Sequence, residues 1–175
     1  MGTMEKILQL LNYLASIQPG GKIDEMRAYK LIWLIDRYHL RQYGRTVTGD
    51  SYNAEPYGIV PSVIASEYIS KSQEKKNKSL KDSNMRVFSE SDVDAINVIL
   101  GAYGKMDYRE LSKLSYEFPE WRYYEDRIND DGRKSNYKVD MNLFFENYDD
   151  GRGLFMDSTE LIDLTMEVYN QYKGY

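Results

Sequence analysis

The sequence contains no cysteine and a single histidine, His39. Without cysteine there is no disulfide framework, no thiolate ligand for a metal ion and no thiol nucleophile. One histidine would leave only carboxylates to complete a zinc site, so we expect no metal ion and no other cofactor. No apolar run reaches the roughly 18 residues that a membrane span requires, and the first residues do not resemble a signal peptide. These absences predict a cytoplasmic protein without a membrane partner.

Basic residues are also fewer than acidic residues. The chain has 23 lysines and arginines against 28 aspartates and glutamates, a formal net charge of −5 and a pI near 5.0. A nucleic-acid-binding protein normally carries a basic face. The lysine-rich stretch 71–81 is an exception, but Glu74 interrupts it and it holds no aromatic ring on which a base could stack. We expect a solvated loop there, and no nucleic-acid partner.

The usual arrangements of catalytic residues are missing as well. His39 lies within a helical pattern, and the chain has neither a GxSxG nucleophile motif nor a complete phosphate-binding loop. The aspartate-rich turns 129–132 and 149–151 lack oxygen ligands at the spacing of an EF-hand loop. Asp36 or Glu55 remains as a lone acid or base, with no second group to share a reaction. We therefore predict that the protein is not an enzyme.

What the sequence does contain is helical periodicity over most of its length. With 175 residues, of which 42% are hydrophobic, the chain can bury a self-sufficient core, and we expect residues 1–175 to form a single domain. Apolar residues between Met4 and Ala15 follow the spacing of one helix face, and Pro19-Gly20-Gly21 ends that helix. A longer helix is predicted to begin at the cap residue Asp24 and to close at Gly44.

This second helix is predicted to be the centre of the fold. Its residues 31–35 are apolar at five consecutive positions, which indicates burial on more than one side. Its cationic residues are expected to follow one remaining polar edge of the helix; they are Arg27, Lys30, Arg37 and Arg41.

Two short stretches have the character of strands. Residues 51–55 and 85–88 partly alternate between apolar and polar side chains, and we predict that they pair. Pro61 is expected in the first turn of a third helix that reaches about Ser70. Residues that can cap further helices follow at Ser89, Ser91 and Asp107, and a last helix is predicted from about Ser158. The predicted fold class is α+β, mainly α: a compact helical domain around a central buried helix, with a small antiparallel β-sheet.

Tyrosine is the most unusual part of the composition, with 17 residues beside two tryptophans. A tyrosine combines a large apolar ring with a polar tip and few rotatable bonds, which suits binding surfaces. In the alternative interpretation, most of these rings are half-buried at the rim of a helical core. The densest group consists of Tyr52, Tyr57, Trp121, Tyr123 and Tyr124.

Several motifs also occur in an order that is typical of one family. The first are Lys30–Trp33 on a helix, the turn Tyr43-Gly44-Arg45, the aromatic strand Tyr52–Glu55 and the Tyr-Gly-x-Val-Pro-Ser step at Tyr57–Ser62. They are followed by Ser89-Glu90-Ser91-Asp92, Tyr103-Gly104, Leu111-Ser112-x-Leu114-Ser115 and Pro119-x-Trp121. Over residues 23–121 the chain resembles the Panacea-domain (SocA-like), phage-associated antitoxins.

The resemblance implies an antitoxin of a toxin–antitoxin or phage-defence module, which neutralises its cognate toxin by direct protein–protein binding. The alternatives are a general interaction or proteolytic adaptor protein, which would also contact a cellular protease, and an enzyme acting on a small or phage-derived substrate. One helix precedes the signature region, and it is too short for a helix-turn-helix module. We therefore do not expect the chain to bind an operator.

The predicted partner-binding face is composed of Tyr52, Glu55 and Tyr57, with support from Trp121, Tyr123 and Tyr124. Pro56 and Pro61 restrict the conformations of this segment, which lowers the cost of ordering it on binding. Its aromatic area and the carboxylate of Glu55 suit a basic toxin surface. In the alternative interpretation, Tyr57 and Pro56 only pack the junction between two helices.

Overall fold

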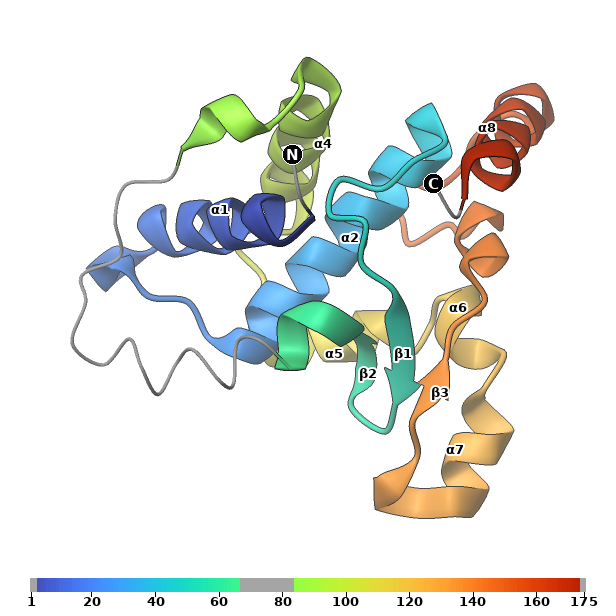
Figure 1. Ribbon diagram of the computed structural model, residues 1–175. Coiled ribbons are helices and arrows are strands. Elements are labelled where there is room, and N and C mark those ends of the chain that lie inside the picture. The colour runs from blue at the N-terminus through green and yellow to red at the C-terminus, as the bar shows by residue number, and fades with distance from the viewer. Residues whose placement is uncertain (1–2, 67–83, 174–175) are drawn as a thin grey trace.

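The computed structural model describes residues 3–66 and 84–173 of the chain, and these form a mainly helical α+β fold (Figure 1). At its centre is helix α2 (Glu25–Tyr43). The Asp24 side chain accepts a hydrogen bond from the backbone N–H of Arg27, and Gly44 closes the helix with φ 82° in the left-handed region. Both predicted caps are confirmed, because each is set by local backbone chemistry.

Other elements surround α2, which explains why its apolar run 31–35 is completely buried. Helices α4 (Glu90–Tyr103), α5 (Tyr108–Ser115) and α8 (Thr159–Tyr172) pack directly on it, as does strand β2 (Gly58–Pro61). Helix α1 (Thr3–Ser16) contributes Ile7, Leu10 and Leu14 to the same apolar cluster. The prediction of a central buried helix is confirmed.

The cationic residues of α2 do not follow a solvent-exposed edge, as the sequence had suggested. Lys30, Arg37 and Arg41 are each 0% exposed, and only Arg27 is partly accessible. Arg41 donates hydrogen bonds to the carbonyl oxygens of Phe144, Glu146 and Phe155. The prediction of a polar edge was wrong, because two different segments cover these residues. Gly58 and Ile59 lie against Lys30, while the chain after residue 138 covers Arg37 and Arg41.

The sheet is antiparallel and has the order β2-β1-β3, from strands β1 (Tyr52–Glu55), β2 (Gly58–Pro61) and β3 (Tyr137–Lys138). The predicted pairing of 51–55 with 85–88 was wrong, since residues Met85–Val87 form the 3-10 helix η3. Strand β1 instead pairs with its immediate neighbour through a tight hairpin, and with the distant β3. The pairing of β1 with β2 is favoured because closing a two-residue turn costs little chain entropy.

Pro61 ends strand β2 opposite Tyr52, and helical turns begin only at residue 62. The proline was therefore predicted in the wrong element. It is tolerated in β2 because that strand lies at the edge of the sheet. The predicted end of this helix at Ser70, and the lysine-rich stretch 71–81, fall outside the described residues.

Of the remaining elements, η1 (Pro19–Gly21) follows α1 at the left of Figure 1, and the others lie in its lower and right parts. These others are α6 (Pro119–Arg122), α7 (Glu125–Asp131), η4 (Gly132–Lys134) and η5 (Met141–Phe145). Of the predicted caps, Ser89 and Asp107 accept hydrogen bonds at the starts of α4 and α5, whereas Ser91 lies inside α4. The last helix begins at the predicted place, with Ser158 as its cap. Among the described helices, none combines the length and apolar character needed to cross a membrane.

Candidate functional site

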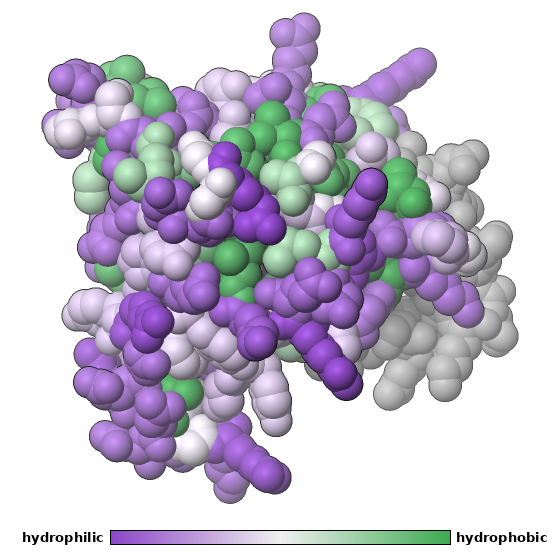
Figure 2. Space-filling model, turned by 180° about the vertical axis from the view of Figure 1, so that it is seen from behind, coloured by the Kyte–Doolittle hydropathy of each residue, from purple (hydrophilic) through white to green (hydrophobic). Residues whose placement is uncertain are grey.

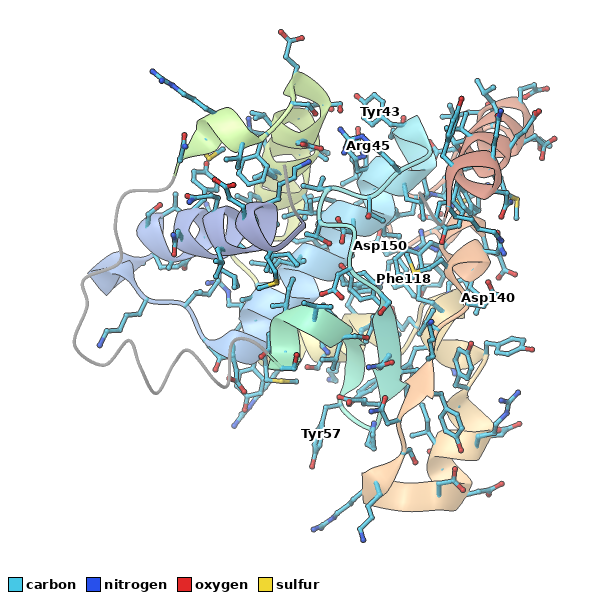
Figure 3. The ribbon with its side chains drawn as sticks, viewed as in Figure 1. Tyr43, Arg45, Tyr57, Phe118, Asp140 and Asp150 are labelled. Atoms are coloured by element: carbon cyan, nitrogen blue, oxygen red, sulfur yellow. The ribbon has the colours of Figure 1, made fainter. Side chains whose placement is uncertain are left out.

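The end of the β1–β2 hairpin is the most distinctive surface feature among the predicted site residues. Glu55 pairs with Gly58, so Pro56 and Tyr57 form the two-residue connection between the strands. Tyr57 is 61% exposed and points away from the body of the molecule (Figure 3). A large aromatic ring is thus presented to solvent at the tip of a turn.

Two aromatic side chains fix the backbone of this turn. The indole Nε1 of Trp121 donates to the carbonyl oxygen of Glu55 at 2.9 Å, and the hydroxyl of Tyr116 donates to the carbonyl oxygen of Pro56 at 2.8 Å. The two rings lie 4.6 Å apart between centroids and stabilise each other. Trp121 is 6% exposed, so it supports the turn from beneath rather than extending its surface.

A buried lysine holds the second strand of the hairpin. Lys30 on α2 donates from Nζ to the carbonyl oxygen of Ile59 at 2.7 Å. Gly58 has φ +108°, and a Cβ atom there would collide with Ser115 Oγ and approach Lys30 Nζ to 3.0 Å. Glycine is therefore required both by the backbone conformation and by the close contact with α2 and α5.

The charges of Lys30 and Glu55 influence each other. Burial lowers the pKa of Lys30 from its usual 10.5 to about 7, and the nearby Glu55 carboxylate opposes that shift. Burial raises the pKa of the half-buried Glu55, against the effect of Lys30. Because Glu55 lies beside a buried cation, its carboxylate contributes to the structure of the hairpin as well as to its surface.

We expect Lys30 to make the protein more stable as the pH rises from about 7 to about 9, below the pH at which tyrosines titrate. In this window the unfolded chain keeps a proton on Lys30 that the folded chain has lost, so the unfolded state binds more protons and stability increases with pH. The slope reaches at most about 1.4 kcal/mol per pH unit. Urea denaturation of the wild type and of Lys30→Met measures it.

The slope should be reduced in Lys30→Met and retained in Lys105→Met, which removes an exposed lysine from another part of the surface. Equal slopes in all three proteins would show that Lys30 stays charged in the folded state.

A second group of aromatic residues lies beside the hairpin, where α6, α7 and β3 meet. Tyr123 is 60% exposed, whereas Tyr124 is 6% exposed and donates its hydroxyl to the carbonyl oxygen of Lys138. The rings of Tyr123 and Tyr124 meet edge to face at 4.9 Å, and those of Tyr124 and Tyr137 are nearly parallel at 5.9 Å. The guanidinium of Arg127 lies over all three rings.

The structure does not bring all six predicted residues to one surface. Tyr52 is 0% exposed, and its hydroxyl donates to Asp36 Oδ2 at 2.6 Å. Asp36 also accepts hydrogen bonds from the backbone N–H groups of Val47 and Thr48. Burial raises the pKa of Asp36 to about 6, although these hydrogen bonds oppose the shift. Tyr52 was therefore wrongly placed at the surface, and it fixes β1 to α2 instead.

A signal for this burial was present in the sequence. In a strand, alternate side chains point to opposite faces. Tyr52 and Ala54 share the buried face of β1, while Asn53 and Glu55 lie on the more accessible face. Alanine at the position two residues after Tyr52 indicated which face packs against the core.

The only histidine has a structural position. His39 is buried, with Nδ1 2.6 Å from the carbonyl oxygen of Arg45 and Nε2 2.9 Å from Ser91 Oγ. Burial lowers the pKa of His39 to about 4, while its hydrogen bond to the Arg45 carbonyl opposes this. A neutral ring thereby links the loop after α2 to the start of α4.

One face of the molecule carries few apolar side chains at the end where α7 lies. In Figure 2, which shows the molecule from behind, this lower part is mostly hydrophilic, and apolar residues gather in patches over the upper half. A partner that binds near the hairpin therefore has few apolar anchors available, and the exposed rings of Tyr57 and Tyr123 are the largest of them.

Comparison with known proteins agrees with the order of motifs in the chain. A sequence model of the family described as "Antitoxin SocA-like, Panacea domain" matches residues 29–122, which is more than half of the chain. No curated protein and no solved structure matched. The matched region runs from the first buried residues of α2, through the hairpin, to Trp121, which anchors the turn of the hairpin. The chain therefore belongs to the SocA-like, Panacea-domain antitoxin family.

Proposed function

We propose that this protein is an antitoxin that neutralises a toxin by direct binding, and that the toxin contacts the hairpin tip. Membership of an antitoxin family supports the role. The observation that supports the location is Tyr57, an exposed ring on a turn whose backbone is fixed by Trp121, Tyr116 and Lys30. The whole chain, 1–175, acts as one binding unit in this proposal, in the cytoplasm.

The physical basis of the proposal is preorganisation. Binding is weakened when a flexible loop must be ordered, and a turn that already has its carbonyl oxygens paired avoids most of that cost. Tyrosine is enriched among the residues that dominate the energy of protein interfaces, because it buries a large area and still offers a hydrogen bond. The half-buried carboxylate of Glu55 at the base of the turn favours a basic toxin surface.

We expect Tyr57→Ala to weaken toxin binding by about 30-fold or more, the loss typical of a central aromatic anchor. The melting temperature should stay close to that of the wild type, since the ring is exposed. The toxin for this test is the product of the adjacent reading frame, expressed with and without the antitoxin. Growth rescue and thermal unfolding are measured together.

Tyr43→Ala is the matched control, because Tyr43 is also an exposed tyrosine and lies at the opposite end of the molecule (Figure 3). Rescue by Tyr57→Ala equal to that by Tyr43→Ala would exclude the hairpin tip as the contact. An adjacent product that is harmless alone, or lethal even with this protein, would contradict the antitoxin role itself.

The carboxylate of Glu55 is better tested with Glu55→Gln than with a charge reversal. A lysine at position 55 would face the buried Lys30 and disturb folding, so a loss of rescue could not be assigned to the interface. Glutamine keeps the shape and removes only the charge that a basic toxin would recognise.

A further inference from the structure

The guanidinium of Arg127 lies against three tyrosine rings. Its guanidinium carbon lies 5.7 Å from the ring centroid of Tyr123, 5.6 Å from that of Tyr124 and 5.8 Å from that of Tyr137. These distances are within the range of cation–π attraction. We call Tyr123, Tyr124 and Tyr137 the tyrosine cluster.

The tyrosine cluster is rigid on one side and open on the other. The Tyr124 hydroxyl donates to the carbonyl oxygen of Lys138 at 3.0 Å and accepts the backbone N–H of Asp140 at 3.0 Å. Tyr137 is fixed by the pairing of β3 with β1. Tyr123, in contrast, is 60% exposed. The cluster thus presents the exposed ring of Tyr123 to solvent, supported by the buried ring of Tyr124 and the partly buried ring of Tyr137.

The guanidinium of Arg127 takes no carboxylate partner, although its own helix is acidic. The other charged residues of α7 are Glu125, Asp126, Asp130 and Asp131. Within the described residues, Arg127 makes neither a hydrogen bond nor an ion pair, and the rings are its only partners. Its side chain is exposed, so little holds it there beyond the attraction of the rings.

We propose that the tyrosine cluster is a subsite for an arginine side chain of the toxin, and that Arg127 fills this subsite in the free protein. The proposal rests on the antitoxin function proposed above and names the chemistry of one contact. On binding, the incoming guanidinium replaces that of Arg127, which turns outward to solvent. The carboxylates of α7 then attract the guanidinium of the toxin, because Arg127 no longer places its own positive charge over the rings.

Arg127 and an incoming guanidinium compete for the same rings. Truncating Arg127 should therefore strengthen binding, whereas truncating an interface residue usually weakens it. If Arg127 occupies the subsite, removing it makes the rings available, and binding of an external guanidinium becomes tighter. If Arg127 only stabilises the local structure, its removal leaves the affinity unchanged or lowers it. One cation–π contact corresponds to about a 2- to 30-fold change in affinity.

The experiment is an NMR titration of the full chain with N-acetyl-arginine methylamide, following the ring signals of the tyrosine cluster. The uncharged N-acetyl-glutamine methylamide is the comparison probe. We expect Arg127→Gln to bind the arginine probe about 2- to 30-fold more tightly than the wild type. Adding Tyr123→Leu to that variant should abolish the binding.

Arg133→Gln is the matched control. It removes the same charge from η4, directly after α7, and Arg133 makes no cation–π contact within the described part of the chain. Arg127→Lys keeps a cation at the cluster and should bind the probe no more tightly than the wild type. Equal affinities in Arg127→Gln and Arg133→Gln, or equal binding of both probes, would overturn the proposal.

Because no toxin is present in this titration, its outcome is independent of growth rescue. If the arginine probe does not bind the tyrosine cluster, the proposed subsite is wrong, and the proposed antitoxin role is unaffected. If the protein does not rescue growth but the probe still binds, the antitoxin role is wrong, and the cluster remains a guanidinium-binding surface.

Discussion

Glu120→Ala is expected to lower the free energy of unfolding by about 3–5 kcal/mol, as the loss of one member of a buried ion pair does. Glu120 Oε2 accepts a hydrogen bond from Arg37 Nε at 2.8 Å and another from Trp33 Nε1 at 2.9 Å. Both side chains of the ion pair are 0% exposed. Removing the carboxylate leaves a guanidinium in the core without a countercharge.

The surroundings of Arg37 explain why solvent cannot replace the lost partner. The guanidinium lies 4.8 Å from the ring centroid of Phe118 and 4.8 Å from that of Phe155. Rings attract a cation, but one such contact is worth less than the cost of burying an unpaired charge. The desolvated cation therefore dominates the expected loss of stability.

Urea denaturation checks this prediction, with the double variant Arg37→Met and Glu120→Leu as the control. Among residues 3–66 and 84–173, Arg37 Nη1 and Glu120 Oε1 find no hydrogen-bond partner, so the pair is not fully satisfied there. Replacing both residues by apolar ones of similar size should cost less than Glu120→Ala alone. A loss below about 1 kcal/mol for the single variant would mean that water reaches the site.

Arg41→Met is the second substitution with a large expected effect, at least about 3 kcal/mol. The guanidinium donates to the carbonyl oxygens of Phe144, Glu146 and Phe155 and to Asp157 Oδ2 at 2.9 Å. Each buried acceptor left without a partner costs about 1–3 kcal/mol. Methionine fills much of the same volume, so the loss reports on hydrogen bonds rather than on a cavity.

The loss in Arg41→Met should be local as well as global. Arg41 holds several backbone carbonyl groups of residues 144–157 against α2, alongside bonds from Arg37 and Gln42 to the same segment, and we expect faster hydrogen exchange there than in α4. Arg45→Met is the control, since Arg45 is 47% exposed in its ion pair with Asp92 and should cost less than about 1 kcal/mol. Uniform exchange along the chain in Arg41→Met would contradict a local role.

Sequence reasoning determined the features that depend on neighbouring residues. Asp24, Gly44, Ser89 and Ser158 mark helix ends in the structure because capping is a contact between a side chain or glycine and backbone a few residues away. The apolar run 31–35 likewise identified the central helix. The family followed from the order of short motifs, each of which is local.

The site could be predicted only in part. Of the residues that the sequence proposed, Tyr57 is exposed at the turn, and Trp121 supports the backbone of that turn. The sequence did not indicate a role at the site for Tyr116, Lys30 or Arg127. Tyr116 and Lys30 contact residues that are distant in the sequence, and no sequence motif marks the contact of Arg127 with the tyrosine rings. Whether a toxin binds there stays a prediction.

The tertiary structure alone decided which residues become partners across long distances. Strand β3 joins β1 from more than eighty residues away, a pairing that no local pattern could favour over 85–88. Lys30, Arg37 and Arg41 looked like a solvated edge of α2, yet all three are buried. A charged side chain can be buried when remote segments supply its acceptors, here Ile59, Glu120 and residues 144–157. Burial is a property of the whole assembly of segments, and only the fold determines it.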